Sequence, residues 1–288
     1  MPGRAKRLDG ANELDGTSNA GTRGAPHLGK RAPEAAARLR ETVPRPDRRR
    51  YHAGVPSREP PLVATFDCYG TLVDWEGGAA GFLYQLALRT GDSEPPPAAE
   101  LRERWERIQF ELISDAYLPY TRVLAESLAE WGRQSHYPVG ADDAEAFARS
   151  MRSWGPFPDT RPALLQARER GLRLVIISNS DHSIMDHTLR QLDVPFDDVV
   201  LAEDARAYKP DDRPFLLALD RLGVPPSRIL HVAFGFTYDI GPAQRLGMQT
   251  AWVNRHVEEA PGPERPDHEW RDLWGLARLV GGRGPGIE

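Results

Sequence analysis

The chain has 288 residues with 37 basic and 42 acidic side chains, long enough for one large core and a smaller accessory domain. Its single cysteine, Cys68, excludes an internal disulfide and favours a reducing compartment such as the cytoplasm. The sequence has no apolar run of membrane-spanning length and no signal segment at its start, so we expect a cytoplasmic protein that contacts no membrane.

Residues 1–60 are predicted to form a disordered basic tail. Positions 1–58 hold 13 Lys or Arg and 6 Asp or Glu, a net charge of +7 that leaves −12 for the rest of the chain. The segment is rich in Gly, Pro, Ala and Arg and has almost no large apolar residue, so it cannot build a core. It is either a solvated extension or a segment that docks an acidic partner, such as a carrier protein or nucleic acid, through Arg48, Arg49 and Arg50. The acidic body argues against nucleic acid as the substrate.

A short buried strand is predicted at the start of the folded part. Leu62 to Phe66 is mostly apolar and partly β-branched, follows a Pro pair and ends at Asp67. Gly70 and Thr71 then turn the chain out of the predicted sheet. This pattern predicts a strand that delivers the Asp67 carboxylate to its carboxyl end.

Residues 77–155 predict an inserted helical domain. Gly77 and Gly78 indicate a flexible exit from the core and, together with Gly155, are the predicted hinges of this insert. Apolar residues recur at helical spacing in three stretches separated or broken by prolines, at 101–112, 123–131 and 147–154. The insert should therefore be a bundle of helices.

Residues 61–76 and 156–288 predict an α/β core. From Pro162 onward strands and helices alternate, which is typical of a Rossmann-like parallel sheet with helices on both faces. The strands predicted in this part are 172–177, 199–201, 229–234 and 249–253. An amphipathic piece at 273–279 is expected to pack on the edge of the sheet.

The residues with chemical potential fall where the predicted strands end. Asp67, Ser178, Asn179, Lys209 and Asp239 all follow strands, and ligands of open parallel sheets bind at the carboxyl ends of strands. Lys209 is also the one lysine outside the predicted tail, which favours a role that needs an ammonium group. We therefore expect these five side chains to form one site.

Four segments of the sequence together resemble the motifs of the haloacid dehalogenase (HAD) superfamily, and the FDCYGTL segment resembles type II 2-haloacid dehalogenases. The segments are FDCYGTL, Ser178-Asn179, Lys209-Pro210 and HVAFGFTYD. The resemblance spans about residues 62–253 and implies an α/β core with a helical cap that covers the active site.

This resemblance assigns a role to each motif residue. Asp67 would be a covalent nucleophile, with Thr71 hydrogen-bonded to its carboxylate. Lys209 would keep Asp67 ionised and bind an anionic substrate, and Asp239 would orient Lys209 or a water molecule. Ser178 and Asn179 would hold the substrate.

Two positions separate dehalogenase from phosphatase chemistry. Tyr69 stands where HAD phosphatases place a second Asp that protonates the leaving alkoxide, whereas halide leaves without a proton. Phe234 stands where those phosphatases have an acidic Mg²⁺ ligand, which leaves mainly Asp67 and Asp239 for a cation that prefers several oxygens. We therefore expect no metal and no other cofactor, with Mg²⁺ required only if the chain is a phosphatase.

Aromatic residues are predicted to line the substrate site. Tyr238 matches the aromatic residue that cradles halide in dehalogenases, and Tyr69 is expected beside it. Phe234 and Phe236 replace polar residues that position the hydrolytic water in those enzymes. Dehalogenases also direct a cap arginine at the halide, and the corresponding helix here offers two arginines, with an acid at the aligned place: Arg104, Arg107 and Glu106.

The first hypothesis is a metal-free hydrolase of the haloacid dehalogenase type, which displaces halide or a similar group from carbon through an ester on Asp67. A second is suggested by the apolar segment around Phe234 and by an Arg-heavy composition typical of a high-GC bacterium. It is a non-hydrolytic enzyme of antibiotic or other natural-product synthesis that expels halide or sulfate with ring closure. A Mg²⁺-dependent phosphatase and a non-catalytic binding subunit are the remaining alternatives. The expected partner is a small anionic substrate, and a homodimer or a protein partner is left open.

Overall fold

The computed structural model describes residues 59–114 and 117–281. Of the predicted basic tail, only residues 59 and 60 belong to this described part. Within it, no helix combines the length and the hydropathy that a membrane crossing requires.

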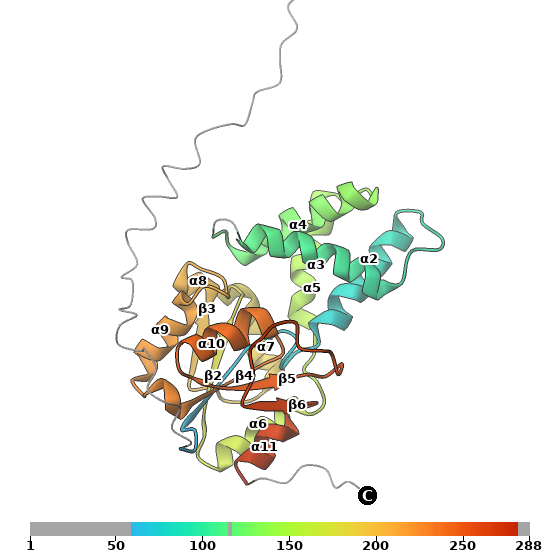
Figure 1. Cartoon of the computed structure of the whole chain (residues 1–288). Helices are drawn as coiled ribbons and strands as arrows, with labels where there is room; N and C mark the ends of the chain where they lie inside the picture. The colour runs from blue at the N-terminus through green and yellow to red at the C-terminus, as the bar shows by residue number, and fades with distance from the viewer. Residues whose placement is uncertain (1–58, 115–116, 282–288) are drawn as a thin grey trace, which may run out of the picture. The chain divides into compact units, whose positions relative to one another are not determined.

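The core is a six-stranded, all-parallel sheet, as the alternating pattern predicts (Figure 1). The strand order is β3-β2-β1-β4-β5-β6, so the first strand of the chain lies in the middle. Five of the strands lie where the sequence predicts them, and the sixth is a short edge strand that pairs with β5. The bounds are β1 Val63–Phe66, β2 Arg173–Ser178, β3 Asp198–Leu201, β4 Ile229–Ala233, β5 Gln249–Val253 and β6 His268–Trp270.

Helices cover both faces of the sheet because every central strand is apolar on both sides. On one face, Phe66 and Ile176 belong to a buried cluster shared with α6, α7 and α11. On the other face, Val175 and Ile177 pack with α9 and the short α10. These helices span Thr160–Glu169 (α6), His182–Leu192 (α7), Arg213–Leu222 (α9), Gly241–Arg245 (α10) and Trp274–Leu279 (α11), and the short α8 spans Ala202–Ala205.

Four helices form the predicted insert. Consecutive helices pack side by side (Figure 1). Large aromatic residues such as Trp105 and Trp131 are fully buried within this bundle. Each of these indoles donates a hydrogen bond inside the bundle, Trp105 to Ser127 Oγ and Trp131 to the Leu101 carbonyl. The helices are α2 Trp75–Arg89, α3 Ala98–Ser114, α4 Tyr120–Ser135 and α5 Ala141–Ser150.

The predicted flexible exit at Gly77 and Gly78 is wrong. Both glycines lie in the first turn of α2, whose N-terminus is capped by the Asp74 carboxylate, which accepts a hydrogen bond from the Gly77 amide at 2.9 Å. A side chain on Gly78 would collide with the ring of Trp154, so this glycine allows close packing of two segments of the chain. The sequence suggested a hinge because glycine serves flexibility and close approach equally well.

Two hydrogen bonds and a contact between aromatic rings join the insert to the core beside the strand ends. The backbone amide of Thr121 donates to Asp181 Oδ2 at 2.9 Å, and Tyr208 donates to the Leu118 carbonyl at 2.7 Å. Phe110 of α3 also lies over Tyr238 of the core, with ring centroids 5.6 Å apart. The insert therefore reaches the edge of the sheet at which the predicted catalytic residues lie.

Candidate active site

Asp67 follows the central strand β1 and is almost completely buried. Its amide donates to the Val232 carbonyl at 3.2 Å, which continues the sheet pairing between β1 and β4 by one residue. The side chain therefore stands at the end of the central part of the sheet, between β2 and β4.

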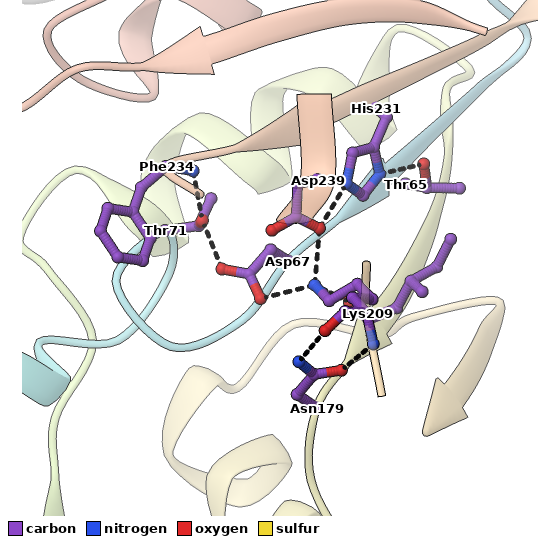
Figure 2. Close-up of polar contacts among 9 residues, drawn as sticks. Thr65, Asp67, Thr71, Asn179, Lys209, His231, Phe234 and Asp239 are labelled. Atoms are coloured by element: carbon purple, nitrogen blue, oxygen red, sulfur yellow. Dashed lines mark hydrogen bonds and ion pairs between the residues drawn. The ribbon is translucent and has the colours of Figure 1, made fainter. Parts of the chain in front are cut away.

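The loop after Asp67 fixes the orientation of its carboxylate (Figure 2). Thr71 Oγ1 donates to Asp67 Oδ2 at 2.8 Å, as predicted, and accepts a hydrogen bond from the Phe234 amide at 2.9 Å. Gly70 has φ = 94°, and a side chain there would collide with the Phe234 ring. This turn therefore requires glycine both for its backbone conformation and for its close contact with the β4 loop.

Lys209 lies directly beside Asp67, as the sequence predicts. Its Nζ is fully buried and donates to Asp67 Oδ1 at 2.9 Å, to Asp239 Oδ1 at 2.6 Å and to the Ile177 carbonyl at 2.9 Å. An ammonium group has three protons, so all of its donors are already used. Lys209 can hold Asp67 in place, but it has no donor left for an anionic substrate.

The two charges adjust each other's pKa. Burial has the largest effect on Asp67 and raises its pKa, while the neighbouring Lys209 ammonium opposes that rise. Burial also acts against the charge on Lys209, but Asp239 and Asp67 outweigh it and raise the pKa of the lysine. The two carboxylates therefore favour the charged form of Lys209, and Lys209 in turn favours the charged form of Asp67 against the effect of burial.

His231 and Thr65 belong to the same buried network, and sequence analysis missed both (Figure 2). His231 Nε2 lies 3.0 Å from Asp239 Oδ1, and its Nδ1 lies 2.9 Å from Thr65 Oγ1. The two residues face each other across β1 and β4 in register. A polar residue inside an apolar strand indicates that it has a buried polar partner. Both predicted strands contain one, so this signal could have led to the pair of Thr65 and His231.

Asn179 positions Lys209 rather than a substrate. Its side-chain oxygen accepts from the Lys209 amide at 2.7 Å, and its nitrogen donates to the Lys209 carbonyl at 3.1 Å. Because both ends of the Asn179 amide bond the backbone of one residue, this side chain holds the Lys209-Pro210 segment against the end of β2. The expected role of Asn179 as a substrate ligand does not fit this geometry.

We expect Asn179→Ala to destabilise the protein by about 1–3 kcal/mol and to reduce activity, because two hydrogen bonds that fix Lys209 are lost. Asn254→Ala is the matched control, since Asn254 makes the same pair of hydrogen bonds, at 2.8 and 2.9 Å, to the backbone of Glu258. Chemical denaturation and a turnover assay of both variants check this. Equal activity in the two variants would contradict a positioning role for Asn179.

The hydroxyl groups of Ser178 and Tyr69 differ in their hydrogen bonding. Ser178 Oγ, at the end of β2, is buried and makes no hydrogen bond within the described chain, so it can still bind a substrate group. The phenol of Tyr69 lies 2.9 Å from Thr188 Oγ1 of α7, and burial raises its pKa. Tyr69 therefore has no ionised form to offer, and its hydroxyl is already paired.

The three aromatic residues after β4 separate into two groups. Phe234 and Tyr238 pack edge to face with centroids 6.2 Å apart, and the Tyr238 ring lies 5.9 Å from Lys209 Nζ. Phe236 instead packs on Trp252 at 5.0 Å, in a small cluster with Ile240. The structure thus brings Phe234 and Tyr238 to the site and places Phe236 in a separate contact. This segment is a π-helical turn, Phe236–Ile240, which brings Asp239 back to Lys209.

The donor set does not fit a magnesium ion. The oxygens of Asp67 and Asp239 that face each other are both bonded to Lys209 Nζ, which takes the position between them. Asp239 Oδ2 is buried without a hydrogen bond in the described chain, but one free oxygen is too few for a hard cation. In the described residues, no group of three or more His, Cys, Asp or Glu is placed to hold a metal.

The cap helix α3 contributes an acid and an arginine near the site. Arg102, rather than Arg104 or Arg107, lies over the start of α2, with its guanidinium 5.5 Å from the centre of the Trp75 ring. Arg104 pairs with Glu100 on the outer face, at 2.5 Å, and Arg107 is exposed. Glu106 accepts from Arg102 at 2.7 Å, and burial raises the pKa of the Glu106 carboxyl.

A buried carboxylate at the centre of a parallel sheet, hydrogen-bonded to a hydroxyl and a lysine and covered by a helical insert, is typical of the HAD superfamily. Residues 62–247 match the family model of the haloacid dehalogenase-like hydrolases. The chain belongs to that family.

Individual relatives support the same classification. The (S)-2-haloacid dehalogenase 4A of Burkholderia cepacia is 26% identical over 67% of this chain and 83% of its own length. A phosphoserine phosphatase of Thermus thermophilus is 31% identical, over 53% of this chain and 61% of its own length. Among solved structures, an L-2-haloacid dehalogenase superposes with a TM-score of 0.69 and 25% identity, covering 78% of this chain and all of the other. The chain is a HAD-like hydrolase related to 2-haloacid dehalogenases.

Proposed function

We propose that this protein displaces halide, or a comparable leaving group, from the carbon of a small organic substrate without a metal ion. The reaction begins when Asp67 Oδ1 or Oδ2 attacks the substrate carbon, and the carbon–halogen bond breaks with its electron pair leaving on the halide. Water then attacks the Asp67 carbonyl carbon of the resulting ester. This releases an alcohol and restores Asp67 with one new oxygen.

The observation that carries this proposal is the Asp67, Lys209 and Asp239 arrangement. Lys209 neutralises the Asp67 carboxylate at 2.9 Å and also bonds Asp239 Oδ1, so of the four carboxylate oxygens only Asp239 Oδ2 is without a hydrogen bond in the described chain. Tyr69 offers no acidic proton to a leaving alkoxide, because burial raises the pKa of its phenol. A nucleophile with neither acid nor metal assistance is suited to leaving groups that depart as stable anions.

Halide release from 2-chloropropionate and 2-chloropropionamide, followed with an ion-selective electrode, tests the proposal. Turnover of either compound in H₂¹⁸O should place one ¹⁸O in Asp67, seen by mass spectrometry of the peptide that contains it. Phosphate release from p-nitrophenyl phosphate that depends on Mg²⁺, without halide release, would favour the phosphatase instead.

A second candidate is the non-hydrolytic displacement with ring closure, and one observation favours it. The Phe234 ring packs against Gly70, in the loop that follows Asp67, and its centre lies 6.5 Å from that of the Trp75 ring. These apolar groups form a wall beside Asp67. Such a wall disfavours a hydrolytic water on that side. Analysis of product mass separates the two reactions, since hydrolysis adds the elements of water and ring closure does not.

We expect Phe234→Ser to speed hydrolysis of the Asp67 ester, because the serine hydroxyl can hydrogen-bond a water in the space that the ring vacates. Loss of the part-buried ring should cost about 2 kcal/mol of stability. Phe236→Ser is the matched control, since it removes an equivalent ring that packs on Trp252. Single-turnover trapping of the ester in both variants checks this, and equal ester lifetimes would refute a water-excluding role for Phe234.

The remaining alternatives lack such support. A non-catalytic subunit would have no use for two carboxylates buried around one lysine, since such a cluster is costly to desolvate. A cytoplasmic location, a role in natural-product synthesis and a homodimer or protein partner stay predictions.

A further inference from the structure

Glu106 lies on the face of α3 that meets the core. Residues 102, 106 and 110 follow each other at intervals of four, which places them on one side of a helix. Arg102 at one end of this row lies over Trp75, and Phe110 at the other end packs on Tyr238. Glu106 stands between them, and its side chain is 31% exposed.

Two tyrosines, Tyr120 and Tyr238, lie near enough to both Glu106 and Asp67 to be affected by the charge of each. Tyr120 is buried, and its hydroxyl lies 3.3 Å from the amide nitrogen of Gln109, three residues after Glu106. The negative charges of Glu106 and Asp67 both contribute to the raised pKa of Tyr120, and both contribute to that of Tyr238. The cap carboxylate and the nucleophile thus lie around the same two phenols.

Arg102 and Lys209, the cations that pair with Glu106 and Asp67, each pair with more than one carboxylate. Arg102 pairs with Glu106 at 2.7 Å, with Glu76 at 3.2 Å and with Glu103 at 3.7 Å. Lys209 is shared between Asp67 and Asp239 and uses its third proton on a backbone carbonyl. Glu76 also pairs with His256, and Asp239 also pairs with His231. When these imidazoles are neutral, each cluster has more acids than cations, so net negative charge borders the space between the cap and Asp67.

Such surroundings oppose a second anion. A 2-haloacid carries a carboxylate, which both Glu106 and Asp67 would repel if it lay between them. A substrate of the same shape with a neutral carboxamide has no such repulsion. Its N–H groups can also donate to Glu106, and its carbonyl can accept from the unpaired Ser178 Oγ.

We propose that Glu106 is a specificity-determining residue, which directs the site toward neutral substrates with a hydrogen-bond donor, such as 2-haloamides, and away from free 2-haloacids. The proposal rests on the displacement chemistry proposed above and names its substrate class. It assigns to Glu106 the contact with the non-reacting end of the substrate.

The experiment compares 2-chloropropionate with its isostere 2-chloropropionamide as substrates of the full chain. The two compounds differ in how easily a carboxylate displaces their chloride. Each enzymatic rate of halide release is therefore divided by the rate at which acetate displaces chloride from the same compound in water. The wild-type protein should favour the amide by about tenfold in kcat/KM, which corresponds to one unfavourable charge contact. Glu106→Gln, which is isosteric and neutral, should bring the two normalised values to within about threefold of each other.

Glu103→Gln is the matched control. It removes the same charge from the same helix and from the same arginine partner, but its side chain is 62% exposed. The ratio of amide to acid should stay at the wild-type value in this variant. A wild-type preference for the acid, or a ratio that Glu106→Gln leaves unchanged, overturns the proposal.

Binding of unreactive analogues separates this proposal from the proposed function. Propionamide and propionate carry no leaving group, so their binding, measured by ligand-observed NMR, does not depend on catalysis. Tighter binding of propionamide that disappears in Glu106→Gln supports the role of Glu106 even if neither chloride is released. Equal binding of the two, with Asp67-dependent halide release intact, overturns the role of Glu106 and leaves the displacement chemistry standing.

Discussion

Asp67→Asn should abolish halide release, with a loss on the order of 10⁴-fold or more, because the amide cannot form the ester. The fold should be retained, since the asparagine oxygen can still accept from Lys209 and the new side chain has the same shape. No ¹⁸O should enter residue 67 during turnover in labelled water. Peptide mass spectrometry and a halide electrode measure both effects on the same samples.

The control for this variant is Asp186→Asn. Asp186 is exposed on the outer side of α7, so its neutralisation changes the net charge by the same amount without touching the site. Its activity should match that of the wild-type protein. Halide release that persists at the wild-type rate in Asp67→Asn would show that another group is the nucleophile.

Lys209→Met should be the most destabilising single change at the site, by about 3–5 kcal/mol at neutral pH. Methionine fills the space but leaves two buried carboxylates without their cation. Lys209→Arg should not restore activity, because a planar guanidinium cannot reproduce three contacts made by a fully buried ammonium. Urea denaturation measures the stability change. Arg245→Met, which removes a half-exposed guanidinium from its ion pair with Asp212, is expected to cost about 1 kcal/mol.

This loss should depend on pH in a defined direction. The pKa of Asp67 is raised by burial and held down in part by Lys209, so removing the lysine raises it further. A carboxyl with a raised folded-state pKa contributes stability that is present at low pH and is lost as pH rises through that pKa. Lys209→Met should therefore recover stability as the pH is lowered. Any residual activity should also be lost at a higher pH than in the wild-type protein when the pH is lowered, because Asp67 becomes protonated sooner.

The double variant Lys209→Met/Asp239→Asn tests the electrostatic origin of the loss. Neutralising Asp239 removes one of the two unpaired charges, so the double variant should be more stable than Lys209→Met alone. If the second change adds further destabilisation instead, packing of the lysine stem rather than charge would be the cause.

The fold was predictable because its signals are local. Apolar runs of strand length alternate with helical patterns, and such a pattern permits few arrangements other than a parallel sheet. The short edge strand β6 escaped prediction because three residues with little burial carry no periodic signal. Gly77 and Gly78 were misread because the Asp74 cap already begins a helix there and because Gly78 serves close packing against Trp154, a residue distant in sequence.

The sequence by itself determined which residues meet at the sheet edge: Asp67, Ser178, Lys209 and Asp239 each follow a strand, and parallel strands end on one side. Only the tertiary structure decided how their hydrogen bonds are distributed. The Asn179 amide is hydrogen-bonded to the backbone of Lys209, and the third proton of the Lys209 ammonium is donated to a backbone carbonyl. Glu106 belongs to α3 of the insert, far from Asp67 in the sequence. Motif spacing fixes which strand end a side chain occupies, but donor and acceptor pairing and net charge depend on neighbours that are distant in sequence.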